Sequence, residues 1–169
     1  MNLKIILVIS LLFAANCGGT VAEKVAPNKP MENKLESFKP YSVTLSVADI
    51  EKSANWYVEK LGFKIVQRKS YPEFNTSLIF TEKNGFRVEL IKDGNATSGA
   101  KRPDPPAHSS IHGVSQFAFE TDDVLALKQE LTAREVPIAW EFENAELGVR
   151  FLFIRDPEGN LIQFLQRLK

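Results

Sequence analysis

Ser-Val-Thr-Leu-Ser-Val-Ala-Asp-Ile at positions 42–50 returns in altered form as Gln-Phe-Ala-Phe-Glu-Thr-Asp-Asp-Val at positions 116–124. The two stretches lie 74 residues apart (116 − 42 = 74), and both place an Asp after a run of alternating residues. The same offset pairs Glu89 with Gln163 (163 − 89 = 74). A constant offset without gaps indicates one folding unit present twice, so the sequence predicts tandem modules.

Each copy carries the signals of a strand, a helix and three further strands. In the first copy, apolar and polar residues alternate from Ser42 to Val47, which predicts a strand. Asp49 is a good N-cap for the helix that follows, and Gly62 ends that helix. The remaining strands are predicted at 63–66, 77–80 and 86–91 in the first copy, and at 116–120, 137–142, 149–154 and 161–168 in the second, whose helix follows Asp123.

We therefore predict an α+β fold in which two βαβββ modules form a curved mixed sheet around a cleft. The folded domain covers residues 40–169, with modules at 40–92 and 113–169 joined by a loop at 93–112. The Arg102–Pro106 part of this loop is rich in proline, which predicts a stiff and extended connection. It serves either as a plain linker or as a contact for a partner protein. His108 and His112 are expected to be exposed loop residues, unless the loop folds over the cleft as a lid.

The bulk composition excludes several classes of function. The 21 basic and 21 acidic residues cancel, and no run of Lys or Arg appears, so nucleic acid is not expected as a partner. The single cysteine, Cys17, excludes an internal disulfide and a cysteine-based metal cluster. With only two histidines, a zinc site of the common His- or Cys-rich kind is hard to assemble.

The N-terminus has the pattern of an export signal. Ile5–Ala15 is an apolar run too short to span a bilayer comfortably, which predicts a signal peptide at 1–16. The sequence before Cys17 resembles a bacterial lipoprotein signal, so we expect lipidation at Cys17, although Asn16 departs from the usual small residue. The polar stretch 17–39 is predicted to be a flexible tether. The expected location is the bacterial cell envelope, anchored by lipid to a membrane; the alternative is a periplasmic or secreted protein.

Strand alternation places a set of polar side chains on one face of the predicted sheets. A polar concave face is typical of a site for a small molecule, although it can also be a plain solvent-exposed surface. The predicted apolar walls of such a site are Ile91, Leu161 and Leu165. The candidate ligand-binding residues are Ser42, Thr44, Arg87, Glu89, Gln116 and Gln163, with Arg87 and Glu89 as a possible ion pair.

Four stretches of the sequence together resemble the vicinal oxygen chelate superfamily, which includes glyoxalase I, bleomycin-resistance proteins and extradiol dioxygenases. They are residues 42–50, the segment from Trp56-Tyr57 to Leu61-Gly62-Phe63, Val88-Glu89-Leu90, and Asp156-Pro-Glu-Gly-Asn-Leu-Ile-Gln163. The resemblance covers about residues 40–168 and implies the fold. It leaves the reaction open, because this fold hosts many. It also implies a tendency to form homodimers.

In metal-dependent members of that superfamily, four side chains hold a divalent ion, and the equivalent positions here are Ser42, Glu89, Gln116 and Gln163. Families like glyoxalase I have His or Gln, Glu, His and Glu at these places. This chain keeps only Glu89, so we expect no metal and no other cofactor, although a hard divalent ion could still bind weakly.

The first hypothesis is therefore a cell-envelope protein that binds a small molecule in the cleft, with a degraded metal site. The first alternative is a metal-dependent glyoxalase-like lyase, isomerase or dioxygenase in which Glu89 is the catalytic base. The second alternative is a protein-interaction module of the envelope.

Overall fold

The computed structural model describes residues 34–37 and 39–168. The chain divides into two compact units, residues 1–38 and 39–169. In the first unit the described part is a 3-10 helix, η1 (Lys34–Ser37). The predicted signal peptide, Cys17 and most of the predicted tether lie outside the described residues. None of the helices in the described part combines the length and apolar character needed to cross a bilayer.

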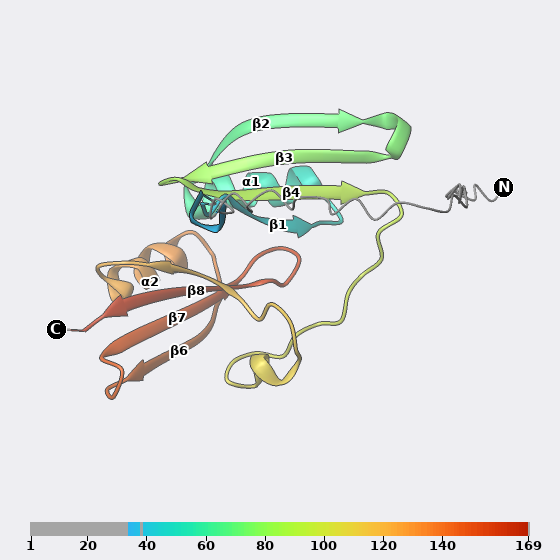
Figure 1. Ribbon diagram of the computed structural model, residues 1–169. Coiled ribbons are helices and arrows are strands. Elements are labelled where there is room, and N and C mark those ends of the chain that lie inside the picture. Colours follow the sequence, from blue (N-terminus) through green and yellow to red (C-terminus); the bar gives the residue numbers. More distant parts are fainter. Residues whose placement is uncertain (1–33, 38, 169) are drawn as a thin grey trace, which may run out of the picture. The chain divides into compact units, whose positions relative to one another are not determined.

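The first module of the second unit is a four-stranded sheet covered by one helix (Figure 1). Its strands follow the order β1-β4-β3-β2, which we call sheet A; β1 is parallel to β4 and the other pairs are antiparallel. The elements are β1 (Ser42–Ser46), α1 (Ile50–Leu61), β2 (Lys64–Tyr71), β3 (Thr76–Lys83) and β4 (Phe86–Asp93), with a 3-10 turn η2 (Pro72–Phe74).

The second module repeats this architecture. Its strand order is β5-β8-β7-β6, which we call sheet B, and β5 is again parallel to β8. The elements are β5 (Phe117–Glu120), α2 (Val124–Ala133), β6 (Ile138–Asn144), β7 (Val149–Arg155) and β8 (Leu161–Arg167). The prediction of an α+β fold with two βαβββ modules is confirmed.

The sequence offset is preserved in the pairing of the strands. Thr44 faces Glu89 across β1 and β4, and adding 74 to each number gives Ala118 and Gln163, which face each other across β5 and β8. The helix starts are also equivalent, because Asp49 and Asp123 both accept hydrogen bonds from backbone N–H groups in the first turn of their helices. The offset of 74 therefore relates equivalent positions of the two modules in the structure as well as in the sequence.

The β2–β3 hairpin extends further than the sequence pattern predicts. β2 runs to Tyr71, whereas the apolar run alone predicted a strand ending at Val66. Residues 67–70 are polar and exposed, so they show no alternation of apolar and polar side chains. Their backbone nevertheless pairs with β3 from Gln67 to Tyr71.

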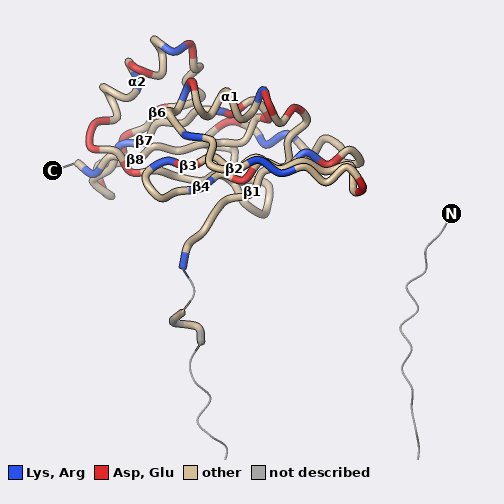
Figure 2. Tube along the Cα trace, turned by 90° about the horizontal axis from the view of Figure 1, so that it is seen from above, with Lys and Arg blue, Asp and Glu red and all other residues tan. Residues whose placement is uncertain are grey.

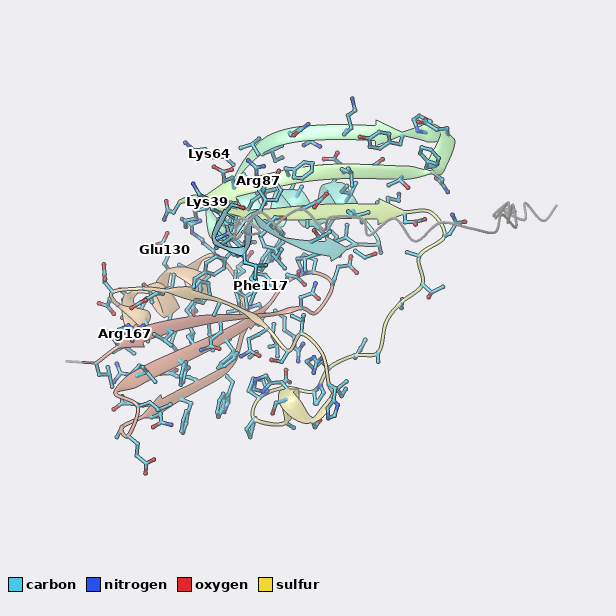
Figure 3. All side chains as sticks on the ribbon, in the orientation of Figure 1. Lys39, Lys64, Arg87, Phe117, Glu130 and Arg167 are labelled. Atoms are coloured by element: carbon cyan, nitrogen blue, oxygen red, sulfur yellow. The ribbon has the colours of Figure 1, made fainter. Side chains whose placement is uncertain are left out.

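The core lies between the sheets and their helices, on the faces that the alternation predicts. Leu45, Val88, Leu90, Ile162 and Phe164 are buried there. Aromatic rings continue this core from one module to the other. The ring of Phe86, at the start of β4, lies 6.2 Å from that of Phe117 and 4.9 Å from that of Phe119 on β5. Arg87, the neighbour of Phe86, and Phe117 can be followed in Figure 3. The two modules therefore share one apolar interior.

A buried polar pair also joins the modules. The hydroxyl of Tyr57 on α1 donates a hydrogen bond of 3.0 Å to Oδ2 of Asp156, in the turn between β7 and β8. Asp156 also accepts hydrogen bonds from Asn160 and from the backbone N–H of Glu158. Burial raises the pKa of the Asp156 carboxyl group, while these hydrogen bonds oppose the rise. Burial, together with the nearby Asp156 charge and hydrogen bond, raises the pKa of Tyr57 strongly.

Charges of both signs are interspersed over the two modules (Figure 2). Several form ion pairs, such as Arg68 with Glu51 and Arg134 with Glu130. Such partly exposed pairs contribute at most about 1 kcal/mol each to stability.

Candidate functional site

The predicted polar face of sheet A carries a hydroxyl–carboxylate pair. Thr44 on β1 donates a hydrogen bond of 2.8 Å from Oγ1 to Oε2 of Glu89 on β4. Both side chains point away from the helix, because their neighbours Leu45, Val88 and Leu90 are buried under it. Ser42 lies two residues before Thr44 on β1, on the same face, and faces Arg87 in the register.

The positions on sheet B that are equivalent to Ser42 and Glu89 carry an amide–amide pair. Gln116 stands immediately before β5, and its Nε2 donates a hydrogen bond of 3.1 Å to Oε1 of Gln163 on β8. Ser115 in turn donates to Oε1 of Gln116. Gln163 is 8% exposed. No hydrogen bond among the described residues uses the amide nitrogen of Gln163.

Arg87 does not pair with Glu89, contrary to the suggestion from sequence spacing. Its Nε and Nη2 both donate to Oε2 of Glu82 on β3, at 3.2 and 2.8 Å. Its Nη1 donates to the Tyr41 hydroxyl at 2.5 Å, and the guanidinium lies 4.9 Å from the centre of the Tyr41 ring. Glu89 is therefore left with Thr44 as its partner. The signal that was missed is the antiparallel register of β3 and β4, which places Glu82 opposite Arg87.

Aromatic residues flank the polar pairs, and the sequence reasoning did not assign them to this face. Phe80 on β3 faces Glu89, and Phe153 on β7 faces Gln163, so each module has a phenyl ring beside its polar position. Trp140 on β6 continues the row next to Phe153, with ring centres 5.7 Å apart. Extending the alternation from β4 and β8 to their antiparallel neighbours would have found all three. The face is therefore a mixture of polar pairs and aromatic walls.

The loop between the modules packs on sheet B and is not a free extended linker. The Arg155 side chain on β7 donates to Oδ1 of Asp104 and to the carbonyl oxygens of Arg102 and Pro103, at 2.9 to 3.0 Å. Pro105 is buried. The segment then forms a short 3-10 helix, η3 (Ala107–Ser110), visible beside the second module in Figure 1.

His108 lies against the polar face of sheet B, contrary to the expectation of an exposed loop residue. Its ring centre is 5.6 Å from that of Phe153, the residue that faces Gln163. His112 is exposed, as expected. The loop therefore covers Phe153 on the polar face of sheet B, and a lid over a cleft stays a prediction. The sequence signal was weak, because the contact depends on Arg155, which is more than forty residues away.

Replacing Arg155 with alanine is expected to release this segment from sheet B, because three acceptors of the segment, on Arg102, Pro103 and Asp104, lose their donor at once. Amide hydrogen exchange in residues 101–112 should speed up by at least about tenfold, corresponding to about 1.4 kcal/mol of local opening energy. Arg167→Ala, which removes an exposed pair with Glu120, is the matched control and should leave that exchange unchanged. Unchanged exchange in both variants would show that Arg155 does not hold the loop.

The four positions that the sequence resemblance makes equivalent to metal ligands carry a donor set that does not fit a transition metal. Ser42, Glu89, Gln116 and Gln163 offer one hydroxyl, one carboxylate and two neutral amides. Zinc, nickel and iron favour imidazole, thiolate or several anionic ligands. Within residues 34–37 and 39–168, no three His, Cys, Asp or Glu side chains gather into a candidate metal site. No hydrogen bond in the described part joins the Thr44–Glu89 pair to the Gln116–Gln163 pair, so their meeting in one cleft stays a prediction.

Comparison with known proteins assigns the family. The sequence profile of the Glyoxalase/Bleomycin resistance protein/Dioxygenase superfamily matches residues 40–164. The chain therefore belongs to this superfamily, as the sequence resemblance indicated.

Two kinds of curated relative are similar to this chain. A lactoylglutathione lyase of Neisseria meningitidis is 27% identical over 124 residues, covering 73% of this chain and 86% of the relative. A bleomycin resistance protein of Geobacillus stearothermophilus is 27% identical over 134 residues, covering 74% of this chain and 94% of the relative. Among solved structures, a glyoxalase family protein from Enterococcus faecalis matches with a TM-score of 0.64 at 20% identity, covering 76% of this chain and 97% of that one. The fold is thus shared, while lactoylglutathione lyases and bleomycin resistance proteins both stand among the relatives.

Proposed function

We propose that the protein binds a small neutral molecule on the polar faces of the two sheets, and that its ancestral metal site is reduced to Glu89. The observation that carries this proposal is the Gln116–Gln163 amide pair, at the positions that the offset of 74 makes equivalent to Ser42 and Glu89. Paired amides keep free donors and acceptors, and they recognise groups of matching polarity without a charge.

The chemistry around the amides supports a neutral ligand. Phe153 and Trp140 supply apolar surface beside Gln163, and Arg155 is occupied by the loop. An ion placed beside Gln163 would lose hydration without gaining a counter-charge, which is costly. A molecule with an apolar body and a hydrogen-bonding edge fits this surface better. The similarity to a bleomycin resistance protein supports a function other than that of a lyase.

A metal-dependent lyase or dioxygenase with Glu89 as base is the alternative, and the similarity to lactoylglutathione lyases favours it. The donor set at positions 42, 89, 116 and 163 argues against it.

We further propose that the protein is exported and held at the cell envelope by lipid on Cys17, supported by the apolar run Ile5–Ala15. A homodimer remains a prediction from the family resemblance, and a role of the 102–106 loop as a partner contact remains a prediction as well.

The binding proposal is tested by extracting small molecules from the purified full-length chain and identifying them by mass spectrometry. The wild type should carry a compound that the Gln163→Leu variant loses, because leucine keeps the volume and removes both polar atoms of the amide. Gln129→Leu, at an exposed position on α2, is the control and should retain the compound. Equal retention by wild type and Gln163→Leu would contradict a site at the amide pair.

A further inference from the structure

A cavity of about 420 Å³ lies between the two modules, on the helix side of the sheets. It is open to solvent, and its size is in the usual range for small-molecule sites. None of Ser42, Glu89, Gln116 and Gln163 lines it, so it is separate from the polar faces described above. Its walls come from the end of α1, the β3–β4 turn, β5, α2 and Phe164 of β8; Glu130 of α2, one of its residues, is labelled in Figure 3.

The repeat explains why this space is open. The offset of 74 makes Leu131 of α2 the counterpart of Tyr57 of α1 (57 + 74 = 131), and both are buried. It also makes the β3–β4 turn, with Gly85, the counterpart of the β7–β8 turn, with Gly159 (85 + 74 = 159).

The two helices meet the turn of the opposite module in different ways. Tyr57 reaches the β7–β8 turn and fills the space there with its ring, ending in the hydrogen bond to Asp156. Leu131 has neither the ring nor the hydroxyl, and the cavity lies between it and the β3–β4 turn residues Lys83 and Asn84. The cavity is therefore the place where one module lacks the phenol that the other supplies.

The walls have the chemistry to hold an aromatic ring. Four phenyl side chains line the cavity, together with Leu127 and Leu131. Phe119 contacts both Phe63 and Phe86 edge to face, at 6.2 and 4.9 Å between ring centres, and stacks on Phe164 at 5.8 Å. Aromatic rings prefer such edge-to-face and offset contacts, so a further ring in the cavity would join an existing cluster.

The rim of the cavity carries a cation that lacks a carboxylate partner. Nζ of Lys83 donates to the carbonyl oxygen of Leu61 at 2.6 Å, which leaves two of its three N–H donors, and no ion pair among the described residues involves it. Lys60 has only a distant contact of 3.8 Å with the exposed Glu135. The acidic residues on the rim form ion pairs, Glu130 with Arg134, which also lines the cavity, and Glu120 with Arg167. The free charge at the mouth is thus positive.

We propose that this cavity is a second binding site, and that it takes a small aromatic carboxylate. The ring occupies the space that corresponds to the Tyr57 side chain in the other half of the molecule. The carboxylate meets Lys83 and Lys60, where a charge-assisted hydrogen bond is stronger than a neutral one. The proposal does not depend on the ligand of the polar faces.

The test uses 2-naphthoate as the probe and titration calorimetry of the full-length protein as the measurement. The wild type should bind the probe and should bind 2-naphthamide, its uncharged analogue, at least about tenfold more weakly, because the charge-assisted bond to Lys83 is lost. The Lys83→Gln variant should bind 2-naphthoate more weakly than the wild type by a similar factor. Lys69→Gln, on the exposed β2 strand, is the control and should leave binding unchanged.

The decisive variant is Leu131→Tyr, which gives α2 the residue that α1 carries at the equivalent position. It should abolish binding of 2-naphthoate while leaving the unfolding midpoint no lower than that of the wild type. If this variant does not fold, Lys83→Glu at the exposed rim replaces it. It should also abolish binding of 2-naphthoate, because it reverses the charge that meets the carboxylate. Unchanged binding in Leu131→Tyr or Lys83→Glu, equal affinity for acid and amide, or no binding of 2-naphthoate at millimolar concentration would overturn the proposal.

Discussion

Replacing Asp156 with alanine is expected to lower the free energy of unfolding by at least about 3 kcal/mol. The change removes the acceptor for the Tyr57 hydroxyl, for Nδ2 of Asn160 and for two backbone N–H groups, in a place where Tyr57 is completely buried. Buried donors that lose their partner retain the full cost of desolvation. Urea unfolding of the two proteins measures the difference.

The repeat supplies a matched control for this variant. Glu82 is the residue equivalent to Asp156 (156 − 74 = 82), but it forms a half-exposed ion pair with Arg87. Glu82→Ala should therefore cost less than about 1 kcal/mol. If the two substitutions cost the same, Asp156 does not hold the modules together.

The pH dependence gives an independent check on the same group. Burial raises the pKa of Asp156, so the carboxyl group of Asp156 binds its proton more tightly in the folded chain than in the unfolded chain. The stability that this group contributes is therefore present at low pH and is lost as the pH rises through the folded pKa. Relative to Asp156→Asn, which carries no charge, the wild type should lose stability from about pH 4, the ordinary Asp value, towards neutrality. If the difference in free energy of unfolding between the wild type and Asp156→Asn stays constant with pH, or changes in the opposite direction, the pKa of Asp156 is not raised.

Restoring metal ligands is expected to produce a tight metal site. The triple variant Ser42→His, Gln116→His, Gln163→Glu recreates, with the native Glu89, the ligand set of glyoxalase-like enzymes. If the four positions converge, its affinity for Ni²⁺ or Zn²⁺ should exceed that of the wild type by at least about a hundredfold, about 2.7 kcal/mol. Calorimetric titration of both proteins with each metal measures this.

Two histidines added at a different place on the protein provide the control. A variant with its two new histidines at exposed positions on β2, Gln67→His and Lys69→His, has the same number of added imidazoles without the repeat geometry. It should bind metal no more tightly than a surface histidine pair. Equal affinity in the two variants would show that residues 42, 89, 116 and 163 do not form a common site.

Much of the fold could be predicted from the sequence because its signals are local and occur twice. The alternation from Ser42 to Val47 and the caps at Asp49 and Asp123 predict elements that the structure contains. The end of β2 was not predictable in the same way. Its last residues are polar, and only pairing with β3 holds them in a strand.

The site was predictable only in part, for a related reason. The faces of β1, β4, β5 and β8 follow from alternation, which predicts Thr44, Glu89, Gln116 and Gln163 on one face. The hydrogen bonds from Thr44 to Glu89 and from Gln116 to Gln163 could not be read from it. The partner of Arg87 depends on how β3 is aligned with β4, and a shift of one residue would have sent Glu82 to the other face. The position of His108 depends on Arg155, which the chain brings close only after folding. Contacts between distant segments carry no local signal.

The metal content of the wild-type protein tests the central claim most directly. The full-length chain should be purified without chelator from cells grown with added nickel and zinc, and its metals measured by elemental analysis beside those of Glu89→Ala. Since one carboxylate and neutral groups make a poor site for these ions, both proteins should hold transition metal far below stoichiometric amounts. A near-stoichiometric transition metal in the wild type that disappears in Glu89→Ala would contradict a binding protein with a reduced metal site, and would establish the metalloenzyme in its place.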